Sequence, residues 1–176
     1  QLHKSALREA MTLEADRMAN LGLSKEEFDK EIKVVMEERR WRTEDQAQAL
    51  VFEQLNAAAF VASPYRAPTV GWMNDLESMT VEDTREWYER WYAPNNALLV
   101  VAGDVTPAEV LALARETYGR IPARPLPVRK PQLEPAQRGE RRLSVKAPAD
   151  NPLVLMGFHA PALRDVEKDD EVYALE

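Results

Sequence analysis

Apolar and polar positions along the first 120 residues alternate mostly with the period of amphipathic helices. Ser24 with Glu27, and Thr80 with Asp83, have the spacing of capping boxes, and each opens such a segment. Thr106-Pro107 opens another, with proline at the first helical position. The pattern therefore predicts helices over residues 4–20 and 25–40, a third ending near 60, and two more over residues 81–92 and 107–118. The third is largely apolar, so we expect it to be well buried.

Three further segments have the pattern of strands instead. Residues 97–103 form a short apolar run that closes at Gly103, which is typical of a buried strand. Residues 141–147 alternate between polar and apolar positions, and residues 152–159 form a more apolar run. The predicted class is α+β, with helices packed on one face of a mainly antiparallel sheet.

Prolines divide the chain. Five of them fall between residues 122 and 135, which predicts a semi-rigid extended linker over residues 122–136. The linker would separate a first domain, residues 1–121, from the start of a following module, residues 137–176, with a helix beginning near 167. The first residues carry no signal segment, and the last ones read as a helix just begun, so we expect a portion of a longer protein.

Composition narrows the function classes. The net charge of −7 disfavours a nucleic-acid partner, because binding phosphates needs a basic surface. The chain has no cysteine, which excludes disulfides and thiolate metal sites, and no apolar run long enough to span a membrane. We expect a soluble protein and leave its compartment open between bacterial cytoplasm and periplasm.

Glu31 and Glu38 are the candidate functional residues. They stand seven positions apart in the predicted helix 25–40, so both carboxylates point to the same side. On a helical wheel that side falls within the apolar arc of Phe28, Ile32 and Val35. A carboxylate facing a core must be paired, hydrogen-bonded or bound to a cation.

Several segments in order resemble a known family. They are Glu14-Ala-Asp-Arg-Met18, Glu31-Ile-Lys-Val-Val-Met-Glu-Glu38-Arg-Arg40, Arg42-Thr-Glu-Asp45, Pro64-Tyr65, and Trp91-Tyr-Ala-Pro-Asn-Asn96 followed by the apolar run to Val105. Together they resemble the pitrilysin/insulinase family of zinc peptidases, which includes the mitochondrial processing peptidases and bacterial zinc proteases. The resemblance extends over nearly the whole chain.

The resemblance implies a zinc site of the inverzincin type. Such enzymes carry His-x-x-Glu-His on a helix, two histidines binding zinc and the glutamate acting as general base. By resemblance, Glu38 is the third zinc ligand and Glu31 is the glutamate that orients the site without touching the metal. Side chains seven apart on a helix root about 10 Å from each other, which fits one ligand and one supporting group.

The sequence departs from the family in one major respect. It has no His-x-x-Glu-His, and its two histidines, His3 and His159, stand in no such motif. Because catalytic zinc normally takes three protein ligands, we expect this chain by itself to be inactive and not to bind zinc tightly. Without the metal, Glu38 is expected to pair with Arg42 at i+4, and Glu31 could equally be an ordinary charge at the rim of the apolar face.

Two functions remain open. The first is a portion of a zinc metalloendopeptidase that hydrolyses unfolded peptides, with a second related half or subunit completing a clam-shell. The alternative is a non-catalytic scaffold or peptide-binding subunit of the same family. A generic interaction domain with coincidental motifs is a third, weaker reading.

Overall fold

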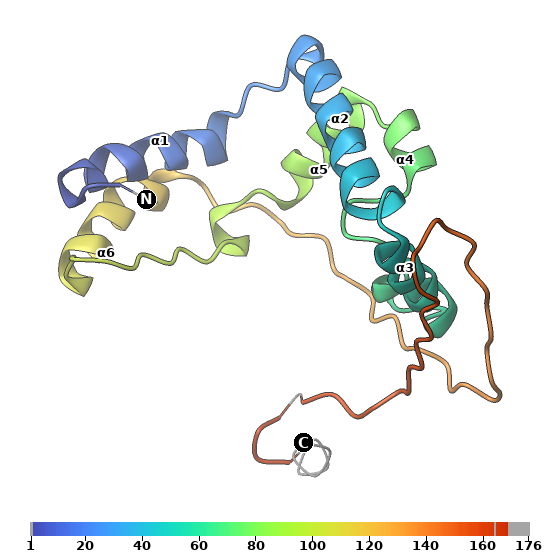
Figure 1. Ribbon diagram of the computed structural model, residues 1–176. Coiled ribbons are helices and arrows are strands. Elements are labelled where there is room, and N and C mark those ends of the chain that lie inside the picture. Colours follow the sequence, from blue (N-terminus) through green and yellow to red (C-terminus); the bar gives the residue numbers. More distant parts are fainter. Residues whose placement is uncertain (1, 164, 169–176) are drawn as a thin grey trace. The chain divides into compact units, whose positions relative to one another are not determined.

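A computed structural model describes residues 2–163 and 165–168 of the chain (Figure 1). Six α-helices in these residues alternate with short 3₁₀ turns and one π-helical turn. The α-helices are α1 (Leu7–Asn20), α2 (Lys25–Arg39), α3 (Ala47–Ala59), α4 (Met73–Ser78), α5 (Val81–Trp91) and α6 (Pro107–Glu116). The short turns are η1 (Lys4–Ala6), the π-helical η2 (Arg40–Glu44), η3 (Pro64–Arg66), η4 (Pro94–Asn96) and η5 (Tyr118–Arg120).

The chain divides into two compact units. The first unit comprises Gln1–Met36 and Met73–Pro131, and the second comprises Glu37–Trp72 and Gln132–Glu176. The boundary at Met36 falls inside α2, so the last turn of that helix belongs to the second unit. None of the helices in the described ranges combines the length and apolar character that crossing a bilayer requires.

Local capping explains where several helices begin. At α5 the full capping box forms: the Asp83 N–H donates to Thr80 Oγ1 (3.2 Å), and Asp83 Oδ2 accepts from the Thr80 N–H (2.8 Å). The Thr106 hydroxyl accepts the Glu109 N–H at α6, and Ser24 Oγ accepts the Glu27 N–H at α2. These helix starts were predicted from the sequence and are confirmed.

The first unit contains a small apolar interior. Met11 and Ala15 of α1 and Leu113 of α6 are buried, and the two helices are in contact. Tyr88 of α5 is also buried, and its hydroxyl donates to the Met18 carbonyl (2.7 Å) and accepts the Leu21 N–H (3.1 Å). This one phenol satisfies backbone groups at the end of α1, where the last carbonyls of a helix have no partner within it.

The second unit is organised around α3. Glu134 lies near the end of the proline-rich stretch and accepts three consecutive backbone N–H groups after α3, those of Val61 (2.7 Å), Ala62 (2.9 Å) and Ser63 (2.8 Å). Arg141 donates to the carbonyl of Ala59 at the end of the same helix (3.0 Å). Charged side chains thus fasten the segment after residue 132 to the C-terminal end of α3.

The prediction of an α+β fold with an antiparallel sheet is wrong. Within residues 2–163 and 165–168 no strand is found, and the segments 97–103, 141–147 and 152–159 run without ladder pairing. Leu98 is 89% exposed and Val100 75% exposed. Apolar composition favours an extended backbone, but a strand also needs a neighbouring backbone to exchange hydrogen bonds with, and these segments have none in the described chain.

The predicted burial of the third helix is also wrong. No residue of α3 is buried, and Phe52 is 53% exposed. The short turns η2 and η3 contact α3, and Gly157 lies against Leu55, but these segments together bury no residue of the helix. The helix expected to begin near 167 falls largely on residues 169–176, outside the described residues.

Candidate functional site

Glu38 lies in the last turn of α2, and its side chain is 38% exposed. Its Oε1 pairs with Arg42 Nη1 at 2.9 Å, four residues further on in η2. This is the i+4 partner that the sequence indicates for a metal-free Glu38. A half-exposed pair of this kind is worth about 0–1 kcal/mol, so it restrains the carboxylate only weakly.

Glu31 lies two turns earlier on α2 and is exposed. No side-chain hydrogen bond or ion pair joins it to any other described residue. Val34 on the same helix is 59% exposed as well. The expectation that Glu31 faces a core was therefore wrong: Phe28, Ile32 and Val35 of the apolar arc are half-buried, whereas Glu31 lies at its exposed edge.

Arg39, next to Glu38, is a charged residue that is buried in the second unit. Its guanidinium donates two hydrogen bonds to Glu53 of α3, from Nη1 to Oε2 at 2.8 Å and from Nη2 to Oε1 at 3.1 Å. Nη1 also donates to the Gly71 carbonyl at 2.9 Å. The two side chains are only 6% and 7% exposed, so both charges have left water and depend on each other.

Two further groups complete this surrounding. Glu44, at the end of η2, places Oε1 3.2 Å from Arg39 Nε, and the Trp72 ring lies 5.8 Å from the guanidinium carbon. The hydrogen bonds that Arg39 donates to Glu53 raise the pKa of Arg39, and the Glu44 carboxylate adds to the rise against the opposing effect of burial. Arg39 is therefore a fixed cation throughout the physiological range of pH.

The backbone between Glu38 and α3 makes a π-helical turn. The Asp45 N–H donates to the Arg40 carbonyl (2.8 Å), a bond across five residues instead of four. Single π-turns in helices occur frequently at functional sites. The Arg39–Glu53 pair could not be predicted from the sequence, because the two residues lie on different helices, and on one continuous helix fourteen positions would separate them by about 21 Å.

The residues present do not complete a zinc site. Within the described part of the chain, no three side chains of His, Cys, Asp or Glu type form a group able to hold a metal ion. His159 Nε2 donates to the Ala59 carbonyl (3.1 Å), and its ring packs edge-on against Phe60. Glu38 offers one ligand, whereas catalytic zinc takes three from the protein.

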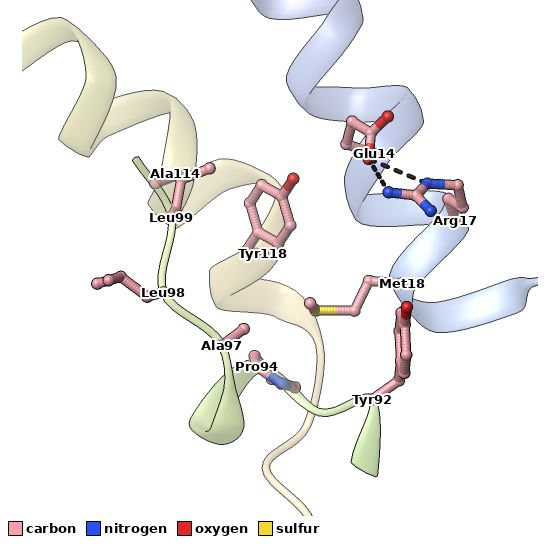
Figure 2. A pocket seen from close by; sticks show the side chains of 10 residues that line it. All are labelled: Glu14, Arg17, Met18, Tyr92, Pro94, Ala97, Leu98, Leu99, Ala114 and Tyr118. Atoms are coloured by element: carbon pink, nitrogen blue, oxygen red, sulfur yellow. Dashed lines mark hydrogen bonds and ion pairs between the residues drawn. The ribbon is translucent and has the colours of Figure 1, made fainter. Parts of the chain in front are cut away.

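The first unit holds a separate pocket of about 260 Å³, seen in Figure 2. It lies between α1 and the segment 97–99, and its charged groups are Glu14 and Arg17, joined at 2.5 Å. Burial raises the pKa of the Tyr118 phenol, and the Glu14 carboxylate adds to that rise. The remaining lining is largely apolar, so this pocket offers a surface for apolar contact and no metal-ligand set.

Comparisons with known proteins agree with the resemblance. The zinc protease PqqE of Helicobacter pylori is 32% identical over 164 residues, which cover 90% of this chain and 36% of the relative. A crystal structure of a protease from Helicobacter pylori superposes with a TM-score of 0.69 at 30% identity, covering 75% of this chain and 32% of that one. The first half of the periplasmic protease PqqL from Escherichia coli gives a TM-score of 0.66 at 25% identity, over 77% of this chain and 29% of that one.

These relatives are about three times longer than the aligned part, so the chain spans about a third of their length. A family model described as the peptidase M16 inactive domain matches residues 78–176, more than half of the chain. The family expected from the ordered motifs is confirmed by this match and by the similar zinc proteases. The chain belongs to the M16 peptidases, the pitrilysin/insulinase family.

Proposed function

We propose that this chain is a portion of a zinc-dependent metalloendopeptidase that cleaves unfolded peptides, and that Glu38 is a zinc ligand in the complete protein. The observation that carries the proposal is the position of Glu38: a half-exposed carboxylate in the last turn of α2, in a chain similar to zinc proteases. The remaining ligands and the general base would come from sequence outside these 176 residues. By itself the chain has no complete metal site and is inactive.

The pairing of Glu38 with Arg42 is compatible with this role. The Arg42 side chain is 60% exposed, so a cation approaching Glu38 displaces it at small cost. Until a metal arrives, Arg42 gives the Glu38 carboxylate a weakly held partner. Glu31, exposed and without a partner in the described chain, is free to orient groups that approach α2 from outside this sequence.

The second candidate function is a non-catalytic scaffold or peptide-binding subunit. Its support is the matching family model, which is described as an inactive domain and extends over residues 78–176. In both cases we propose a second related half as partner, since a similar solved chain is the first half of a protease. The two candidates differ in whether the complete protein holds zinc.

Zinc content and peptidase activity of the full-length protein test the proposal. Glu38→Gln removes the ligand charge, and we expect it to abolish stoichiometric zinc and peptide hydrolysis. Glu37→Gln is the matched control, because Glu37 is the neighbouring exposed glutamate and pairs with Arg40. We expect it to leave both properties unchanged.

The outcomes separate the candidates. Zinc and activity that survive Glu38→Gln would overturn the ligand role. A wild-type full-length protein that binds unfolded peptides but neither holds zinc nor cleaves them would favour the non-catalytic subunit.

A further inference from the structure

We infer that Arg39 is a positioning residue for Glu38: its buried clamp on Glu53 and the Gly71 carbonyl fixes the junction of α2 and η2, and with it the direction of the Glu38 carboxylate. The inference rests on the proposed function of Glu38 and adds a residue to it. Arg39 touches neither substrate nor metal in this role and acts through the backbone it shares with Glu38.

Hydrogen bonds hold the Arg39 side chain in one position. Its guanidinium makes three hydrogen bonds at 2.8, 3.1 and 2.9 Å to Glu53 and Gly71, from a side chain that is 6% exposed. Paired, planar contacts of this kind fix orientation as well as distance. Rotation of the last turn of α2 would have to break all of them at once.

The two hydrogen-bond partners of Arg39 come from different segments of the chain. Glu53 lies on α3, and Gly71 lies in the loop that follows η3. Gly71 has φ +97°, a conformation that side-chain-bearing residues rarely adopt, and its N–H closes a turn on the Pro68 carbonyl. The end of α2 is thus tied to a helix and a loop, so its position does not depend on the helix alone.

The π-turn η2 is also in contact with Arg39. Glu44, its last residue, contacts Arg39 Nε at 3.2 Å, so the clamp closes over both ends of the turn. A π-turn is a rare backbone state that persists where its surroundings favour it. Without the clamp, residues 40–44 lose that support, and the Glu38–Arg42 pair that spans the junction moves with them.

Neighbouring arginines show that charge alone does not explain Arg39. Arg40 and Arg42 are 44% and 60% exposed, and each forms one ion pair on the surface. A buried ion pair is weak evidence for stability, since apolar side chains of similar volume often serve as well. Its advantage is a defined geometry, which a metal ligand on the adjacent residue requires.

The test uses the full-length protein with Arg39→Met, Glu53→Gln and the exposed control Arg40→Met. Two readouts are measured: the zinc Kd by competition with a chelator, and hydrogen exchange of the amides of residues 40–46. We expect Arg39→Met and Glu53→Gln to raise the zinc Kd about 10–100-fold, the range seen when groups supporting a ligand are lost. Exchange at residues 40–46 should become faster in both, and Arg40→Met should change neither readout.

The results can be told apart from a failure of the proposed function. If Glu38→Gln abolishes zinc binding but both clamp variants keep the wild-type Kd, the role of Arg39 is overturned and that of Glu38 stands. If Glu38→Gln leaves zinc unchanged, the ligand proposal fails and takes this one with it. Should Arg39→Met not fold, Glu53→Gln, which keeps the volume and one acceptor, decides the question alone.

Discussion

The two units bury opposite kinds of side chain. Among the described residues, the buried positions of the first unit are all apolar or aromatic: Met11, Ala15, Leu76, Val81, Tyr88, Ala93 and Leu113. In the second unit the described residue that is buried is Arg39, at 5% exposure. The first unit is therefore stabilised mainly by apolar contacts. The second is stabilised by the Arg39–Glu53 ion pair and by hydrogen bonds from backbone N–H groups to the Glu134 carboxylate.

Because of this difference, we expect the two units to lose stability in different ways when their buried side chains are changed. Apolar contact weakens gradually as methylene groups are removed. A buried ion pair fails abruptly when one partner is removed, because the other charge is left without water or counter-charge. Substitutions in the two units can show whether the contrast is real.

The largest effect is expected for Glu53→Leu, which strands the Arg39 guanidinium. We expect a loss of about 3–5 kcal/mol in the free energy of unfolding, measured by urea denaturation. The double variant Arg39→Met/Glu53→Leu should recover most of that loss, since no charge remains buried. A single variant that costs less than about 1 kcal/mol would mean that water reaches the pair in solution. If the positioning role is right, the double variant regains stability and still binds zinc weakly.

A smaller effect is expected for Tyr88→Phe in the first unit. The change keeps the buried ring and removes the hydroxyl, leaving the Met18 carbonyl and the Leu21 N–H without their partner. We expect a loss of about 1–2 kcal/mol in the same measurement. Tyr92→Phe is the control, because the Tyr92 side chain is 41% exposed, and it should be nearly neutral. Equal losses in the two variants would contradict a specific role for the Tyr88 hydroxyl.

A local effect is expected at Glu134. Its bonds to the N–H groups of Ser63 and Val61 lower the pKa of this carboxyl below its ordinary 4.5. A lowered pKa means that the contact is fully present above pH 4.5 and is lost as the pH falls through the lowered value. The protection of the amides of residues 61–63, measured as their exchange rate relative to that of an unfolded chain at the same pH, should therefore decrease in that acidic window.

Glu134→Gln should give the same loss of protection at neutral pH, and the exposed Glu140→Gln should not. Exchange at residues 61–63 that is unchanged in Glu134→Gln would mean that the carboxylate is not what protects these amides.

The smallest effect is expected for Leu98→Ser. Leu98 is 89% exposed, so replacing it should change the free energy of unfolding of this chain by no more than about 0.5 kcal/mol. A loss above about 2 kcal/mol would show that the segment 97–103 is covered in solution, and the contrast between the units would then need revision.

Helix starts could be predicted from the sequence because capping is local: Thr80 and Asp83 meet whatever the rest of the chain does. The Glu38–Arg42 pair follows from helical spacing for the same reason. Residues 97–103 were wrongly predicted to form a strand, because a strand depends on a neighbouring strand that its own composition does not specify.

For Glu31 the sequence left a core-facing and a rim position open, because burial depends on what packs over a helix, and the rim position is the one found. Arg39 was missed because its partners, Glu53 and Gly71, are distant in sequence and follow no periodic spacing. The family could be identified because it is carried by residue types in order, which need no knowledge of packing.

The π-turn at Arg40–Glu44 has a consequence for the length of the chain. A turn closed across five residues holds one residue more than an α-helical turn, so it acts as a single-residue insertion between α2 and α3. Removing one residue from 40–44 would close the junction as an ordinary α-helical turn, and the chain would leave α2 for Gln46, the extended residue before α3, in a direction rotated by about 100°. Glu53 would then no longer face Arg39, even though neither residue had been changed.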